Sequence, residues 1–206
     1  MADTVFPDPN GAPAQPATSP LDLTFALHAL MADIAAVCEE LRHIDMSRVV
    51  VIFSQARSPK LDGVRASIYP LRFEGGGRRA RVRGHEFQMP RVTAGSKEAL
   101  YVVSYTLPRF LDVTFEEKLT AVVHEMYHIS PRFDGQLRRF AGGKPYHTGS
   151  QKNYDAVMAA IAERYLAATR RPDLHAFLRH TFRELTEIHG GVVGARMRAP
   201  NPYRIA

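Results

Sequence analysis

The chain has 206 residues, of which 45% are apolar and 23% charged, and its formal net charge is +6 with nine histidines counted as neutral. These values are ordinary for a soluble globular protein, and the length suits one domain with a tail. No apolar run approaches the roughly 20 residues of a membrane span, and no signal peptide is recognisable. Cys38 is the only cysteine, which excludes an internal disulfide. We therefore expect a cytoplasmic protein in which His, Asp and Glu hold any metal.

The predicted elements begin after a tail of residues 1–20, which we expect to be disordered because it holds five prolines among small and polar residues. Helical spacing of apolar residues predicts a helix over residues 21–44, and residues 49–53 are typical of a buried strand. The later elements are predicted as follows: strand 66–73, turn 75–77, returning strand 79–83 continued over 86–92, strand 100–106, and helices 115–129, 151–168 and 173–188.

This order of elements predicts an α+β fold, in which a small, mostly antiparallel sheet packs against several helices. We expect one domain over residues 21–189, followed by an irregular, basic C-terminal tail over residues 190–206. Residues 100–106 come just before the helix at 115–129. We expect them to form an exposed sheet edge, to which an extended peptide could add as a further strand.

The sequence His-Glu-Met-Tyr-His lies at residues 124–128, within the helix predicted over 115–129. Residues four apart lie on one face of a helix, so His124 and His128 can offer two imidazoles to one metal ion. Glu125 can reach a water molecule on that metal as a general base. This H-E-x-x-H pattern is typical of zinc peptidases. Thr114 and Glu117 form a predicted capping box that starts the helix.

A catalytic zinc ion usually has a third protein ligand, and the sequence offers four candidates: His147, Asp134, Asp155 and Glu163. We favour His147, because imidazole suits zinc and the loop before it is long enough to return a residue to the metal. Asp134 has the metzincin offset from His128. However, Pro131 occupies the position of the glycine that this pattern needs to turn the chain. Asp155 and Glu163 fall on the next predicted helix.

The segment HEMYHISPRFDGQLRRF, followed by YHTGSQKNYD, resembles a family of phage metallopeptidases that is related to the SprT-like zinc proteins. Thr148 departs from the SprT-like pattern, which has glycine there. The resemblance implies a minimal zincin-like fold, proteolytic activity, one Zn²⁺ per chain and His147 as the third ligand. It covers about residues 120–160 and does not supply the substrate.

The sequence therefore predicts a zinc-dependent metallopeptidase with Glu125 as its general base and a protein or peptide as its substrate. Three tyrosines are candidate oxyanion donors: Tyr127, Tyr146 and Tyr154. Two other functions remain open: an SprT-like protease acting on nucleic-acid-bound proteins, and a non-catalytic zinc-stabilised binding or regulatory module. Nucleic acid is a candidate partner because arginines cluster at three places. These arginines are Arg78, Arg79, Arg81 and Arg83; Arg138 and Arg139; and Arg196, Arg198 and Arg204.

Overall fold

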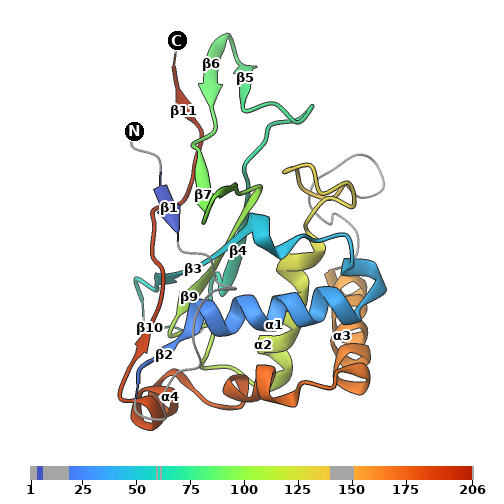
Figure 1. The fold of residues 1–206 in the computed structure, drawn as a ribbon, viewed down its shortest axis with the longest axis vertical. Helices are drawn as coiled ribbons and strands as arrows, with labels where there is room; N and C mark the ends of the chain where they lie inside the picture. Colours follow the sequence, from blue (N-terminus) through green and yellow to red (C-terminus); the bar gives the residue numbers. More distant parts are fainter. Residues whose placement is uncertain (1–3, 7–18, 59, 61, 140–150, 206) are drawn as a thin grey trace.

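The computed structural model describes residues 4–6, 19–58, 60, 62–139 and 151–205. Their helices and small sheets form the α+β fold that the sequence predicts (Figure 1). Four of the seven strand pairings among these residues are antiparallel. None of the described helices has the length and apolar character needed to cross a bilayer.

The central sheet has the strand order β3 (Val49–Gln55), β9 (Tyr101–Leu107), β4 (Ala66–Pro70). β3 runs parallel to β9, and β4 runs antiparallel to it. β9 is therefore the central strand, so the expectation that residues 100–106 form the exposed edge is wrong. An apolar run predicts burial but not position within a sheet, and a strand buried on both faces fits the centre. The two edge strands are β3 and β4.

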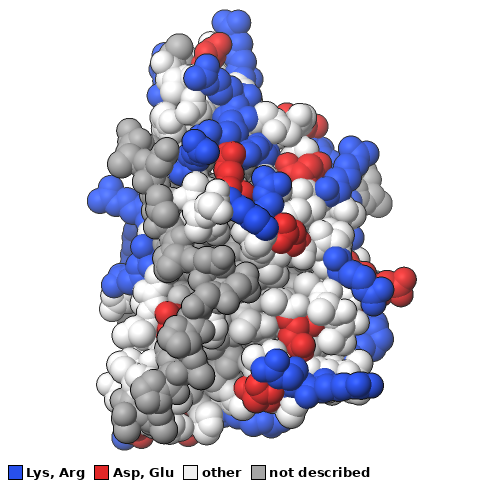
Figure 2. All heavy atoms as spheres, in the orientation of Figure 1, with Lys and Arg blue, Asp and Glu red and all other residues white. Residues whose placement is uncertain are grey.

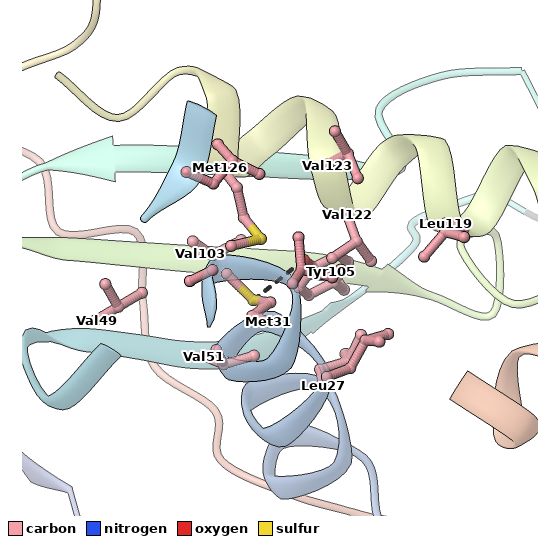
Figure 3. Close-up of a cluster of buried hydrophobic side chains, with 14 of the residues drawn as sticks. Leu27, Met31, Val49, Val51, Val103, Tyr105, Leu119, Val122, Val123 and Met126 are labelled. Atoms are coloured by element: carbon pink, nitrogen blue, oxygen red, sulfur yellow. Dashed lines mark hydrogen bonds between the residues drawn. The ribbon is translucent and has the colours of Figure 1, made fainter. Parts of the chain in front are cut away.

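Two helices cover one face of the central sheet. α1 (Leu23–Val37) crosses it, and α2 (Phe115–Tyr127) lies beside α1 (Figure 1). Side chains from both helices and from the inner face of β3 and β9 form the main core (Figure 3). The Tyr105 hydroxyl, at the centre of this core, donates to Met31 Sδ at 3.5 Å. α3 (Gln151–Ala168) packs against α2.

A second, smaller core lies on the other face of the sheet, around Val50, Ile52 and Val102. Residues of β7 (Val92–Ala94) contribute to this core, and β7 pairs with β1 (Thr4–Phe6) and β8 (Lys97–Glu98). β1 lies within the tail expected to be disordered.

A separate antiparallel sheet of β5 (Arg79–Val82), β6 (His85–Gln88) and β11 (Tyr203–Arg204) projects from one end of the molecule (Figure 1). We expected β5 to return along β4, but β5 pairs with β6 instead. The reason is the two-residue turn at Arg83 and Gly84, whose φ angles of 50° and 85° suit a tight hairpin. The predicted glycine turn at residues 75–77 is present but only redirects the chain toward β5.

The remaining elements differ from the sequence prediction at their ends. α1 ends at Val37, where Cys38 adopts an extended conformation, and the short 3-10 helices η2 (Glu39–Leu41) and η3 (Met46–Arg48) follow. The helix predicted over 173–188 is two elements, η4 (Pro172–Arg179) and α4 (Phe182–His189), because Thr181 starts a new helix with its own capping box. The C-terminal stretch, expected to be irregular, contributes β10 (Val192–Val193), which pairs with β2 (Leu21–Asp22), as well as β11.

Lys118 ties α2 to the C-terminal helices. Its side chain is buried, with 2% of the residue exposed, and its Nζ donates to the carbonyls of Leu178 at 3.0 Å and His180 at 2.7 Å. Burial lowers the pKa of this amine below its ordinary value. The two carbonyls lie at the end of η4, where backbone acceptors lack helical partners. Lys118 therefore satisfies groups that would otherwise be buried without a donor.

We expect Lys118→Met to lower the free energy of unfolding by about 2–3 kcal/mol, because one buried and one part-buried carbonyl lose a charged donor. Urea denaturation would measure the change. Lys97→Met is the matched control, since exposed Lys97 donates to the Ser47 hydroxyl, and its effect should stay within about 0.5 kcal/mol. Equal losses in both variants would contradict a structural role for Lys118.

Candidate metal centre

The helix that carries the H-E-x-x-H sequence starts as predicted. The Thr114 hydroxyl accepts from the Glu117 amide at 3.2 Å, and the Glu117 carboxylate accepts from the Thr114 amide at 3.1 Å. This reciprocal pair is the capping box expected from the sequence. Val122, Val123 and Met126 then enter the core. Their burial sets the rotation of α2 about its axis and thereby the direction of the two histidines.

The two histidines converge. Nε2 of His124 and Nε2 of His128 lie 3.0 Å apart, and the ring centroids are 4.7 Å apart. Two nitrogens bound to one tetrahedral zinc at the usual Zn–N length would lie about 3.3 Å from each other. His128 is buried and His124 is half-buried. The pair therefore fits two positions of a zinc coordination shell with little adjustment.

Glu125 lies between α2 and the edge strand β4. The residue is 8% exposed, and burial raises the pKa of its carboxyl to about 7. A hydrogen bond from the Ile68 backbone acts in the opposite direction and lowers this pKa, but its effect is smaller. Ile68 belongs to β4, so the carboxyl is next to the strand that ends the central sheet. The carboxyl predicted to be the general base thus lies beside β4, whose outer side no strand of the described residues pairs with.

The loop after α2 holds the buried end of the helix. The His128 carbonyl accepts from the Arg138 amide at 2.7 Å, and the Ser130 amide donates to the Gln136 carbonyl at 3.2 Å. The Tyr101 hydroxyl anchors the loop to β9, because it donates to the Gln136 carbonyl at 2.7 Å and accepts from the Gly135 amide at 3.0 Å. The chain therefore turns back and passes His128 again.

Tyr154 of α3 closes the other side of the histidine pair. Its ring centroid lies 5.1 Å from that of His124 and 6.1 Å from that of His128. Burial raises the pKa of this phenol above its ordinary value, with smaller contributions from Tyr127 and Glu125. The hydroxyl is therefore protonated at neutral pH and able to donate. Of the three predicted tyrosine donors, Tyr154 stacks on His128, and Tyr127 lies 6.0 Å from the Tyr154 ring.

The third ligand favoured from the sequence, His147, lies outside the described residues, as does Tyr146. Asp134 is a turn residue, since its two carboxyl oxygens accept from the backbone and side-chain nitrogens of Gln136 at 3.2 and 3.0 Å. Asp155 and Glu163 are exposed on α3. Within the part of the chain that the structure describes, no three His, Cys, Asp or Glu side chains are grouped to hold a metal ion.

Arg138 is a member of a basic cluster in the sequence, and in the structure it lies beside the histidine pair. Its guanidinium lies 4.0 Å from the Tyr127 ring centroid, and its Nε donates to the Tyr127 carbonyl at 2.7 Å. The contact depends on the return of the loop after α2. No local pattern in the sequence signals that return.

Comparison with protein-family models, with curated proteins and with solved structures found no match for this chain.

Gly135 offers a test of the loop beside His128. Its φ is +80°, and an added Cβ would lie 2.5 Å from Arg72 Cγ. We expect Gly135→Ala to destabilise the protein by about 2–4 kcal/mol, from left-handed strain and crowding together. Gly84→Ala is the control: φ is +85° and nothing lies within 4 Å, so only the strain of about 1 kcal/mol remains. If both variants lost the same stability in thermal unfolding, the contact with Arg72 would add no cost, and the loop would be able to move away from the added methyl group.

Proposed function

We propose that the protein is a zinc-dependent metallopeptidase that hydrolyses a peptide bond with Glu125 as the general base. The observation that carries the proposal is the pair of converging Nε2 atoms with a buried carboxyl between them in sequence. A zinc site that only stabilises a fold needs the imidazoles but has no use for this carboxyl. Its burial beside a sheet edge therefore favours an enzyme over a binding module.

His124, His128 and His147 would hold the zinc ion. Bound zinc supplies a Lewis acid that acidifies a water molecule and polarises a carbonyl. His147 follows Arg138 by nine residues and precedes Tyr154 by seven. Both flanking residues lie close to the histidine pair, since the Arg138 amide bonds to the His128 carbonyl and Tyr154 stacks on His128. At about 3.3 Å per residue, neither flanking stretch is too short for His147 to reach the pair.

Glu125 would move the protons of the reaction. Its carboxylate accepts a proton from the attacking water and later delivers one to the leaving amine. Tyr154 would stabilise the developing oxyanion by donating a hydrogen bond, because its protonated phenol lies next to both histidine rings.

The edge of β4 would hold the substrate. Among the described residues no strand pairs with the outer side of β4, and Ile68 of this strand bonds to Glu125. An extended peptide that adds to this edge would pass directly beside the base. This arrangement keeps the predicted mode of peptide binding but moves it from residues 100–106 to residues 66–70.

Zinc analysis tests the ligand set. We expect one zinc per chain in the wild type, loss of that zinc in His124→Ala and in His147→Ala, and retention in Asp134→Ala. The exposed His85→Ala variant is the control for removal of an imidazole elsewhere. Zinc lost in Asp134→Ala and kept in His147→Ala would move the third ligand to Asp134.

Glu125→Gln tests catalysis apart from metal binding. We expect turnover of a peptide library, read by mass spectrometry of the products, to fall roughly 10²- to 10⁴-fold while zinc remains bound. Glu116→Gln is the matched control, since Glu116 is an exposed acid in the first turn of the same helix. A Glu125→Gln protein that cleaves as fast as the wild type, with the cleavage still sensitive to a chelator, would contradict the assigned role.

A further inference from the structure

An arginine-rich hairpin and a C-terminal strand that is far from it in the sequence form one projecting structure. We call residues 78–91 and 203–205, which contain β5, β6 and β11, the arginine arm. The arm lies at one end of the long axis of the molecule, away from α4 (Figure 1). The C-terminal stretch belongs to it only because β11 pairs with β6, which the sequence did not indicate.

The charge of the arm is almost entirely of one sign. It holds six arginines, no lysine and no aspartate, and its one acid is Glu86, the register partner of Arg81. Basic side chains gather over this end of the molecule, with few acidic ones between them (Figure 2). The arginines are Arg78, Arg79, Arg81, Arg83, Arg91 and Arg204.

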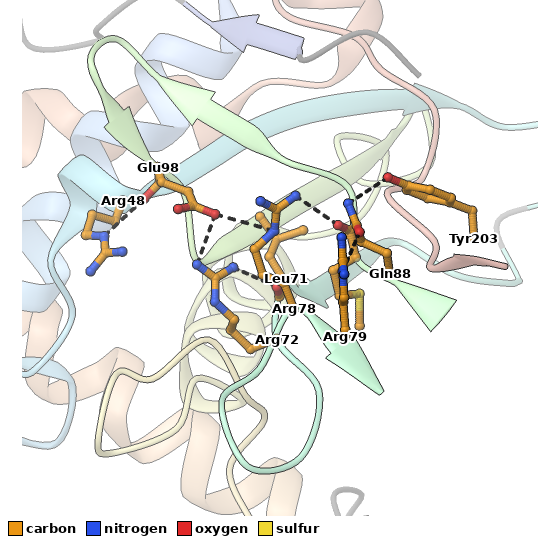
Figure 4. Close-up of polar contacts among 9 residues, drawn as sticks. Arg48, Leu71, Arg72, Arg78, Arg79, Gln88, Glu98 and Tyr203 are labelled. Atoms are coloured by element: carbon orange, nitrogen blue, oxygen red, sulfur yellow. Dashed lines mark hydrogen bonds and ion pairs between the residues drawn. The ribbon is translucent and has the colours of Figure 1, made fainter. Parts of the chain in front are cut away.

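Polar contacts hold β11 on the hairpin. Arg79 Nε donates to the Gln88 side-chain oxygen at 2.9 Å, and Gln88 Nε2 donates to the Tyr203 hydroxyl at 2.9 Å (Figure 4). The Ile205 amide also donates to the Glu86 carbonyl at 2.9 Å. At the base of the arm, Arg78 donates to the Met89 carbonyl at 3.1 Å and lies 3.7 Å from Glu98. The arm is therefore built as one unit.

The distal arginines are available to a partner. Arg79, Arg81 and Arg83 are exposed on β5 and at the turn. The contacts of the first two are with the Gln88 amide and, at a long 3.4 Å, with the Gly84 carbonyl. Neither contact neutralises a guanidinium.

We propose that the arginine arm binds double-stranded DNA through its phosphates, with the hairpin tip entering the major groove. Beyond the Ile205 contact with Glu86, the tip around Arg83 and Gly84 is a two-stranded hairpin, and the major groove, about 12 Å wide, admits a two-stranded ribbon. The planar guanidinium group matches phosphate geometry, and an arm with arginine as its only cation suits this partner. The inference goes beyond the proposed peptidase activity and does not depend on it.

Fluorescence anisotropy with a labelled 20-base-pair duplex and the full chain tests the proposal. If about four phosphates are contacted, raising salt from 50 to 200 mM weakens binding roughly 100-fold. The triple variant Arg79→Gln, Arg81→Gln, Arg83→Gln should bind at least tenfold more weakly and reduce the salt slope by about 3. All three positions are exposed, and an unchanged unfolding midpoint would confirm that the variant folds.

The matched control removes the same charge elsewhere, as Arg42→Gln, Arg170→Gln, Arg183→Gln, three exposed arginines outside the arm. This variant should bind the duplex as the wild type does. Equal weakening of both triple variants would reduce the effect to net charge and overturn the proposal. Tighter binding to the single strand or to anionic vesicles than to the duplex would overturn it as well, as would no duplex binding at 50 mM salt. Zinc content and peptide cleavage report separately on the metal centre, so the two proposals can fail independently.

Discussion

The arrangement of the site depends on how α2 is buried against the central sheet. Val122, Val123 and Met126 pack into the core, and no other rotation of the helix would bury these three side chains together. With the rotation fixed, the helical period places His124 and His128 side by side, and Glu125 against β4. The capping box at Thr114 and the two hydrogen bonds of Lys118 hold the same helix at its start and along its buried face. The apolar residues between the polar ones therefore set the directions of the two imidazoles.

The second constraint is the path of the chain after α2. Tyr101, at the start of the central strand, holds the returning loop, and this loop brings Arg138 next to His128. α3 then places Tyr154 against both histidines. The histidine pair on α2 thus has the loop that carries Arg138 on one side and α3 with Tyr154 on another. The core that orients α2 also supports its neighbours, because Tyr101 and Val103 are buried in the same cluster as Met126.

The sequence predicted the local features well, because those depend on contacts within one element. The capping box of α2, the strand at Val49 and the bounds of α3 follow from short-range spacing and propensity. The order of strands was not predictable in the same way. The apolar residues of β9 predict that it is buried but do not distinguish a central strand from an edge strand, and only its pairing on both sides shows that it is central. The pairing of Tyr203 with the hairpin and the contact of Arg138 with Tyr127 both join distant segments, for which one sequence gives no signal. The site was therefore predictable where it lies on a single helix, and not where the fold completes it.

The two edges of the central sheet differ in how far other segments cover them, and this difference bears on the proposed function. An unpaired edge is a liability unless it is covered or used. On the β3 side, the Phe53 amide donates to the Ala195 carbonyl at 3.0 Å, and the Ala195 amide is held by the Thr24 hydroxyl at 3.1 Å, so the C-terminal segment covers part of that edge. Gly194 permits this approach, because an added Cβ would lie 2.8 Å from the Thr24 side chain. On the β4 side, no described strand pairs with the outer edge, and that edge adjoins Glu125. Under the proposed function, a peptide that adds to the sheet would therefore lie on the β4 side, beside the Glu125 carboxyl.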